Sequence, residues 1–322
     1  MKKKSLFLAA AVLLLAACSS NPKKKVAASG AAGGLSGEVQ ISGAFALYPM
    51  AVRWVEEFKK LHPDVRFDVS GGGAGKGMTD VLAGVVDIGM VSRELYPEEV
   101  AKGALGFATV KDAVIPTINV ANPDLEALLR IGLKRDVAKQ LWDEKIKTWG
   151  EALGTGSKTP VHVFTRSDAC GAAETFAAWL GVKQENLKAT AVFGDPGLAD
   201  AVRKDRVGIG YNNISYAYDQ SSKKPFEGLA IIPLDVNGNG QVDPEERFYE
   251  TSEALIAAIN DGKYPSPPAR DLYLVTNGKP TKPEVIAFLK YVLAEGQQYA
   301  GETGYIGLSK EKLESEINKV EP

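Results

Sequence analysis

Three turns of small residues, each placed directly after a short apolar strand, constrain the fold of this chain most. They occupy residues 43–49, 71–77 and 167–173, and the strands predicted before the first and third cover 38–42 and 161–164. A helical pattern follows each turn. Strand, glycine-rich turn, helix and strand in succession indicate a parallel α/β sheet, in which ligands bind at the carboxyl ends of the strands. We therefore expect the three turns to converge on one ligand.

The third turn has the composition of an anion site. Its sequence from Phe164 to Phe176 is FTRSDACGAAETF, and the helix is predicted to begin at Ala172. A helix N-terminus carries partial positive charge and unpaired N–H donors, and the planar guanidinium of Arg166 suits an oxyanion. Asp168 is placed to hold that guanidinium in one orientation. For this segment alone, the alternative is an ordinary Asp N-cap with Arg166 facing solvent.

The N-terminus has the organisation of an export signal. Lysines precede an apolar run from Leu6 to Leu15, which is shorter than a membrane-spanning helix needs. The sequence Leu-Ala-Ala before Cys18 resembles the lipobox of bacterial lipoproteins, so we expect a signal peptide over 1–17 and lipid on the Cys18 thiol. A plain secretory signal is the alternative. Residues 18–36 lack periodicity and indicate a flexible tether. The predicted location is extracytoplasmic, with the lipid anchored in a bacterial membrane.

Length and charge set further limits. The chain has 322 residues, and about 305 remain after residues 1–17, which is enough for two domains. A formal net charge of −2 gives no sign of a nucleic-acid-binding surface. The chain has two cysteines. If Cys18 carries the lipid, Cys170 is left as an unpaired thiol inside the third turn.

Several motifs then follow one another in a fixed order. They are Gly43–Pro49 (GAFALYP), Gly71–Gly75 (GGGAG), Val86–Leu95 (VDIGMVSREL), Lys111–Pro116 (KDAVIP), Ile146–Trp149 (IKTW), Arg166–Phe176, Val207–Tyr211 (VGIGY), Tyr264–Tyr273 (YPSPPARDLY) and Phe288–Tyr305. In this order they resemble the periplasmic phosphate-binding proteins, the solute-binding subunits of phosphate ABC transporters. The resemblance covers nearly all of the chain after the tether. Several motifs in one order are far more specific than any one alone.

The resemblance implies an α/β, two-lobed type II periplasmic binding protein with a ligand cleft between the lobes. Lobe 1 would comprise residues 37–120 and 270–322, and lobe 2 residues 121–269. Closure about the hinge would present both lobes to the permease of an ABC importer. The family's function needs no catalysis, so we expect a binding protein rather than an enzyme, and a monomer.

The family's phosphate ligands carry over only in part. Positions that supply hydroxyl groups in relatives are Leu47, Ala74, Cys170 and Ala172 here. Each missing hydrogen bond to a charged ligand is worth about 1.5–3 kcal/mol. The groups available to compensate are Ser70, Lys76, Ser92, Arg93, Thr165, Ser167, Asn212 and Asn213. The predicted anion-binding set is Leu47, Tyr48, Ala74, Gly75, Ser92, Arg93, Arg166, Asp168, Cys170, Gly171 and Ala172.

Two interpretations of the pocket follow. In the first, it binds phosphate through backbone donors, Arg166 and a second cation, Arg93 or Lys76. In the second, it binds another oxyanion, such as sulfate, molybdate or tungstate. The same site would also serve an anion sensor that docks to a receptor. A cysteine phosphatase is disfavoured, because its Cys-x5-Arg spacing is absent: Arg166 precedes Cys170.

A second site is predicted in residues 235–246. Their sequence, DVNGNGQVDPEE, places oxygen ligands and one glycine at the spacing of a twelve-residue calcium loop. The expected Ca²⁺ ligands are Asp235, Asn237, Asn239, Gln241 through its backbone carbonyl, Asp243 and Glu246. The alternative is a polar Asn-Gly hairpin. In an extracytoplasmic protein, Ca²⁺ here would make the second lobe more rigid.

Overall fold

The computed structural model describes residues 34–320, which belong to one compact unit. The predicted signal peptide, Cys18 and most of the predicted tether lie outside the described residues. Within them, none of the helices is both long and apolar enough to span a bilayer.

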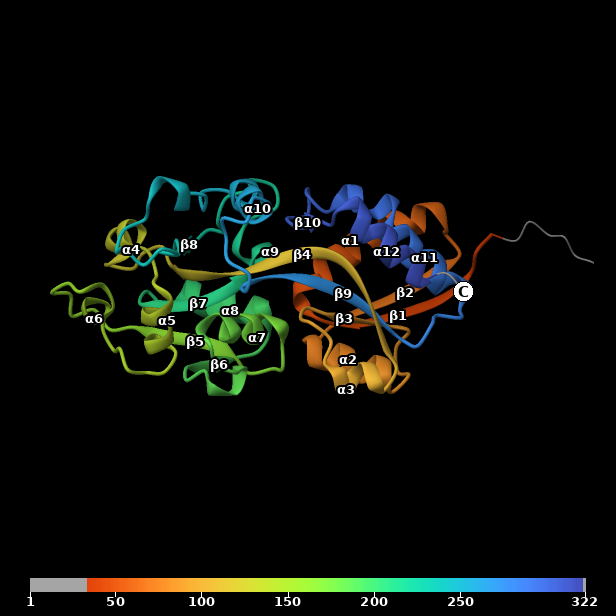
Figure 1. The fold of residues 1–322 in the computed structure, drawn as a ribbon, viewed down its shortest axis with the longest axis horizontal. Helices are drawn as coiled ribbons and strands as arrows, with labels where there is room; N and C mark the ends of the chain where they lie inside the picture. The colour runs from red at the N-terminus through yellow and green to blue at the C-terminus, as the bar shows by residue number, and fades with distance from the viewer. Residues whose placement is uncertain (1–33, 321–322) are drawn as a thin grey trace, which may run out of the picture. The chain divides into compact units, whose positions relative to one another are not determined.

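Ten strands form one mixed sheet (Figure 1). They are β1 (Gly37–Gly43), β2 (Val65–Gly71), β3 (Ile88–Val91), β4 (Ala104–Asn119), β5 (His162–Arg166), β6 (Thr190–Val192), β7 (Gly208–Asn213), β8 (Leu229–Ile231), β9 (Ala269–Asn277) and β10 (Ile306–Gly307). The order is β2-β1-β3-β9-β4-β7-β5-β6, with β8 and β10 also paired to β4. As predicted, β1 is parallel to β2 and β3, and β5 is parallel to β6 and β7. β4 and β9 run antiparallel to their neighbours.

The α-helices are α1 (Tyr48–Leu61), α2 (Ala74–Leu82), α3 (Pro97–Ala101), α4 (Leu125–Ile131), α5 (Arg135–Leu141), α6 (Trp149–Leu153), α7 (Gly171–Leu180), α8 (Gly194–Lys204), α9 (Ile214–Ala217), α10 (Ser252–Asn260), α11 (Pro283–Leu293) and α12 (Lys310–Val320). Helix α2 begins at Ala74, inside the turn predicted over 71–77. Its first turn contains two glycines: Gly77 lies too close to β1 and β3 for a side chain, and Gly75 lies against Ala169 of the third turn.

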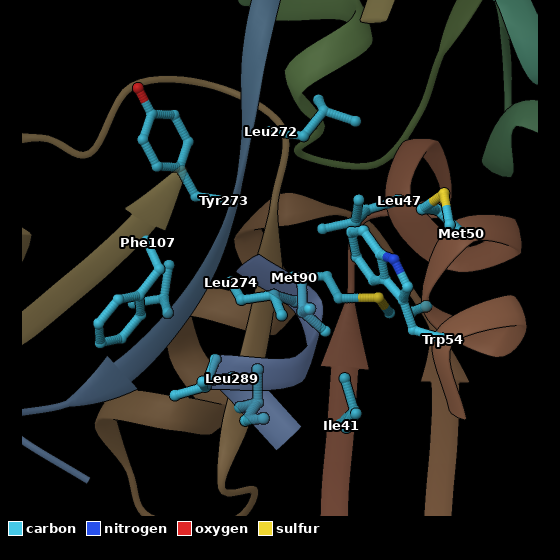
Figure 2. Packing of buried hydrophobic residues seen from close by; sticks show 14 of the residues in the cluster. Ile41, Leu47, Met50, Trp54, Met90, Phe107, Leu272, Tyr273, Leu274 and Leu289 are labelled. Atoms are coloured by element: carbon cyan, nitrogen blue, oxygen red, sulfur yellow. The ribbon is translucent and has the colours of Figure 1, made fainter. Parts of the chain in front are cut away.

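Buried apolar side chains form two large clusters. The first is built from residues between 39 and 110 and between 272 and 320, and Figure 2 shows part of it, with Trp54, Met90 and Leu274 packed together. The second is built from residues between 113 and 269, including Trp142, Phe176 and Tyr211. We refer to the parts built on these two clusters as lobe 1 and lobe 2.

Two long strands, β4 and β9, connect the lobes and lie side by side (Figure 1). On β4, the buried residues up to Val110 belong to the first cluster and those from Ala113 onward to the second. On β9, Ala269 belongs to the second cluster and the residues from Leu272 onward to the first. β4 therefore enters lobe 2 before the predicted boundary at residue 120. At the crossing, Asp112 of β4 lies directly opposite Arg270 of β9 in the register. A buried acid and a buried base thus mark the passage between the lobes.

Gly77→Ala tests the close approach of α2 to the sheet. Helix propensity alone predicts that this substitution stabilises by about 1 kcal/mol. However, a Cβ at Gly77 would lie 2.6 Å from the Met90 carbonyl oxygen and 2.8 Å from the Gly43 Cα. Both are backbone atoms that cannot rotate away, so we expect a net loss of about 1–3 kcal/mol in the free energy of unfolding. Urea denaturation measures it.

Gly301→Ala is the matched control. A Cβ at Gly301 would meet no heavy atom within 4 Å, so its effect should stay within about 0.5 kcal/mol. Equal stability of the Gly77→Ala variant and the native protein would contradict the steric argument.

Candidate functional site

The three predicted turns are linked in space, as expected from the sequence. The backbone N–H groups of Gly72 and Gly73 both donate to the Gly43 carbonyl, which joins the first turn to the second. The N–H of Gly75 donates to the Ala169 carbonyl at 3.1 Å, which joins the second turn to the third. The bond from Gly75 to Ala169 also connects lobe 1 to lobe 2.

The third turn touches lobe 1 at a further point. A Cβ on Gly171 would lie 2.0 Å from the Ser92 carbonyl oxygen. Only glycine permits this approach, which places the N-terminus of α7 against the end of β3. Gly75, Ser92 and Gly171, three of the predicted anion-binding residues, therefore lie where the lobes meet.

Arg166 is fixed by two carboxylates. Its Nε and Nη2 donate to the Asp168 carboxylate at 2.9 and 2.5 Å, and its Nη1 donates to Asp195 at 2.5 Å. The side chain is fully buried, so the alternative in which it faces solvent is wrong. Cys170 takes the N-cap position instead of an Asp, and its Sγ accepts the N–H of Ala173 at 3.4 Å. The predicted contact between Arg166 and Asp168 is confirmed.

Burial and neighbouring charges together set the protonation of this centre. Burial lowers the pKa of Arg166, but Asp195, Cys170 and Asp168 outweigh it, so the net shift is upward and the guanidinium stays charged. Burial raises the pKa of Asp195, against the lowering effect of Arg166 and Arg270. Burial also raises the pKa of the Cys170 thiol to about 12. Cys170 is therefore a neutral thiol near pH 7 and lacks the thiolate that a nucleophilic cysteine needs.

The two cations predicted to assist Arg166 have other partners. Arg93 forms a two-pronged ion pair with Glu99 at 2.9 and 2.7 Å, and its Nε lies 3.1 Å from Glu174 of α7. Its guanidinium also lies over the Tyr96 ring, 3.9 Å from the ring centre. Lys76 pairs with Asp80 one helical turn further on. Arg93 is thus part of a contact between the lobes, and we refer to Arg93, Tyr96, Glu99 and Glu174 as the clasp.

The positions that lack hydroxyl groups are buried. Leu47 packs in the lobe 1 core beside Met50 and Trp54 (Figure 2), and its N–H donates to the Ala44 carbonyl. Ala74, Cys170 and Ala172 are also almost fully buried. Tyr48, the first residue of α1, is half-buried. None of the four replacements brings a hydroxyl to the meeting point of the turns.

Two charged residues at this centre were not predicted to have a role. Asp195 lies on the first turn of α8, and its second oxygen accepts from the Asn213 amide at 2.5 Å. Arg270 donates to the Gly171 carbonyl, to the Thr175 hydroxyl and to the Asn213 side chain. The sequence offered one signal for Arg270, since it is a charged residue within the otherwise largely apolar strand pattern of 269–275.

Asp112 is the most perturbed acid of the connecting strands. One of its oxygens accepts the N–H of Ile214 at 3.3 Å, and the other lies 3.7 Å from Nη2 of Arg270. Burial raises the pKa of Asp112 to about 7; Arg270 and the N–H groups of Ala113 and Ile214 oppose the shift, and Asp195 adds to it. The loss of hydration therefore outweighs the attraction of the arginine.

The predicted calcium loop forms a compact turn. The buried Asp235 carboxylate accepts the N–H groups of Gly238 and Gly240 at 2.7 Å each. Glu246 closes the loop by accepting the N–H of Val236 at 2.9 Å and that of Asp243 at 3.1 Å. Within residues 34–320, no three His, Cys, Asp or Glu side chains gather closely enough to form a metal site as they stand.

Comparisons with known proteins place the chain in a family. The model of the PBP superfamily domain matches residues 28–295, so the chain belongs to the PBP superfamily. Among curated relatives, the phosphate-binding protein PstS of Methanocaldococcus jannaschii is 26% identical, over 83% of this chain and 82% of its own length. The protein of the same name from Pseudomonas aeruginosa is 27% identical, over 90% and 88%.

Solved structures agree on the fold. A structure from Clostridium perfringens, solved with bound phosphate, aligns with a TM-score of 0.69 at 23% identity, over 85% of this chain and all of the other. An ABC-type phosphate transport receptor from Vibrio cholerae aligns with a TM-score of 0.61 at 20% identity, over 84% and 100%. The predicted two-lobed α/β binding-protein fold is confirmed. The curated relatives are named as binding proteins, not as enzymes.

Asp112→Asn tests the burial of this acid through the pH dependence of stability. Because the folded-state pKa is about 7 and the ordinary value is 3.8, between these pH values the folded state binds more protons than the unfolded state. The free energy of unfolding of the native protein therefore includes a contribution that falls as pH rises from about 4 to 7, by up to about 1.4 kcal/mol per pH unit. The variant lacks this contribution, so its free energy of unfolding should rise relative to that of the native protein as pH increases across this range.

Urea denaturation at pH 4.5, 6 and 8 gives the comparison. Asp143→Asn is a control with a nearly flat difference over this range, because Lys145 and Lys188 lower the pKa of Asp143 to about 2, so its carboxyl is ionised in both the folded and the unfolded state. Parallel pH profiles for the native protein and the Asp112→Asn variant would show that Asp112 is ionised throughout.

Proposed function

We propose that this protein is an extracytoplasmic solute-binding protein that captures phosphate between its two lobes and delivers it to an ABC importer. The observation that carries the proposal is the meeting of three small-residue turns at the buried Arg166 and the N-terminus of α7, in a chain of the PBP superfamily. Curated relatives over most of its length are named phosphate-binding proteins. Sulfate, molybdate or tungstate as the main ligand is not favoured by these relatives.

Backbone groups and cations take the place of the missing hydroxyls in this proposal. The first N–H groups of an α-helix have no partner inside the helix, and they attract anions. Helix α7 offers them at Gly171 and Ala172, beside the charged Arg166. The predicted anion-binding residues that lie at the meeting point of the turns are Gly75, Ser92, Arg166, Asp168, Cys170 and Gly171. Of their N–H groups, that of Gly75 is already donated to Ala169 and that of Cys170 to Gln184.

Binding without turnover is part of the proposal. A phosphate-transferring cysteine needs a thiolate, and burial keeps the pKa of Cys170 at about 12. The thiol instead caps α7 through the N–H of Ala173. Absence of hydrolysis of an aryl phosphate by the purified protein tests this point.

Attachment to a membrane through lipid on Cys18 is a further part of the proposal, supported by the lipobox-like sequence before that residue. We also propose a monomer whose partner is the permease of an importer. Recovery of a Cys18→Ser variant from the membrane fraction would contradict the lipid anchor. An anion sensor would bind the same ligand but would co-purify with a receptor instead of a permease.

Calcium is proposed as a structural ion of lobe 2. Support comes from the full twelve-residue pattern over 235–246, and from a loop that folds back on itself around the buried Asp235 carboxylate. Binding would draw the carboxylates of Asp243 and Glu246 toward Asp235 and hold the segment between β8 and α10.

Phosphate binding and its dependence on Arg166 can be measured together by isothermal titration. The protein is first freed of bound ligand by partial unfolding and then titrated with phosphate, sulfate, molybdate and arsenate. We expect phosphate binding at micromolar or lower Kd, and a loss of about 10- to 100-fold in Arg166→Lys. Lysine keeps the charge that Asp168 and Asp195 need, but it lacks the planar fork of donors.

Arg53→Lys is the control, since Arg53 pairs with Glu57 and Glu302 on the surface of lobe 1. If the protein shows no heat of binding with phosphate but binds another of the four anions, phosphate is not the ligand.

The calcium proposal predicts a shift in thermal stability. With Ca²⁺ at about 100 times its Kd, binding adds about 2.7 kcal/mol to the free energy of unfolding. We therefore expect Tm in millimolar CaCl₂ to exceed that in EDTA by about 5 °C or more, and the difference to vanish in Asp235→Asn. Asp143→Asn, outside the loop, should retain it. The same Tm in CaCl₂ and EDTA for the native protein would refute the site.

A further inference from the structure

Arg270 is a buried cation without a full set of partners. Its side chain is 7% exposed, and among the described residues none accepts a hydrogen bond from its Nε. The nearest acid, Asp112, lies 3.7 Å from Nη2, which is too far for a hydrogen bond, and the outer oxygen of Asp112 also has no partner. A buried donor left without an acceptor costs about 1–3 kcal/mol, and more when it is charged. An acceptor brought by a ligand would remove this penalty.

The other contacts of Arg270 place it at the start of α7. Its Nη1 donates to the carbonyl of Gly171, the first residue of that helix, and to the Thr175 hydroxyl one turn later. A cation at a helix N-terminus is unfavourable, because both carry positive charge. Arg166 is connected to Arg270 through two side chains: Arg166 and Asn213 both donate to Asp195, and Asn213 accepts from Arg270. Asp195 and Asn213 thus link the two guanidinium groups, so a ligand oxygen would meet Arg270 at its unpaired Nε, close to the N-terminus of α7.

The alternative cations are occupied elsewhere. Arg93 is ion-paired with Glu99 and Glu174 in the clasp, although its Nε, like that of Arg270, has no hydrogen-bond acceptor among the described residues. Lys76 is paired with Asp80. The sequence alone favoured these two as helpers of Arg166. Arg270 contacts the third turn directly, whereas the described partners of the other two lie outside it.

We propose that Arg270 is the second anion-binding arginine of this protein, with Asp112 as its structural counter-charge. The inference rests on the proposed phosphate-binding function and adds a residue of the connecting strands to a site otherwise built from turns. In this arrangement Arg166 is fixed by Asp168 and Asp195, and Arg270 directs its unpaired Nε to an oxyanion oxygen. The ligand class is a small inorganic oxyanion with at least two acceptor oxygens free.

The position of Arg270 explains how one residue can replace several hydroxyls. It lies on β9 directly opposite Asp112 on β4, at the point where both strands pass between the lobes. Its contacts with α7 and β7 fix its guanidinium in lobe 2. A charged hydrogen bond is about twice as strong as a neutral one. One preorganised arginine thus offsets part of what the Leu47, Ala74, Cys170 and Ala172 positions lack.

The test compares Arg270→Gln, Asp112→Asn and the double variant by phosphate titration, with thermal unfolding of each protein to verify the fold. Arg270→Gln leaves Asp112 without its counter-charge and can unfold; the double variant removes both charges and keeps the volume. We expect the double variant to fold and to bind phosphate about 10- to 100-fold more weakly than Asp112→Asn. Arg53→Gln, a surface arginine substitution, should bind as the native protein does.

Three outcomes would overturn the inference. If the double variant binds phosphate as tightly as Asp112→Asn, Arg270 serves only to neutralise Asp112. If Arg270→Lys, which keeps the charge but lacks Nε, binds with unchanged Kd, Nε has no ligand. In both cases the proposed function would still stand if Arg166→Lys weakened phosphate binding as predicted. If the native protein binds none of the four anions, the proposed function and this inference both fail.

Discussion

The antiparallel pairing of β4 with β9 is the contact on which the rest of this molecule depends. The two strands are the only long elements whose residues belong to both hydrophobic clusters of the described chain. They therefore hold the two lobes together, and the turns of lobe 1 meet α7 of lobe 2 beside them. Each lobe has its own parallel strands and its own core. The pairing of β4 and β9 turns two small α/β units into one protein with a site between them.

This arrangement buries several charged side chains where the lobes meet. Arg166 and Arg270 face Asp112, Asp168 and Asp195 in a region almost without solvent. Taking charges out of water is unfavourable unless each is paired, and Arg166 meets this condition fully. The Arg270 and Asp112 pair meets it only in part, with one atom of each left without a hydrogen bond. Incomplete pairing at one point of an otherwise satisfied network is typical of a place where function outweighs stability.

Much of the fold followed from local patterns. The strand–turn–helix alternation predicted the parallel strands, and small residues at 43–49, 71–77 and 167–173 predicted turns that meet. The Arg166–Asp168 contact was also predictable, because the residues are two positions apart. Asp195 is 29 positions from Arg166 and Glu174 is 81 from Arg93, and no local pattern selects such pairs. The start of α2 was placed too late because glycine disfavours helix, whereas close packing against β1 and β3 requires it at Gly77.

The clasp affects the rates at which a ligand is captured and released. Arg93 and Tyr96 of lobe 1 hold Glu174 of lobe 2, and the bond from Gly75 to Ala169 adds a second contact between the lobes. Breaking these contacts to open the lobes costs their combined free energy, which lowers the population of the open form. The same contacts delay escape once the ligand is enclosed. The clasp therefore exchanges speed of capture for duration of retention, which suits a carrier that must keep its cargo until it reaches a membrane partner.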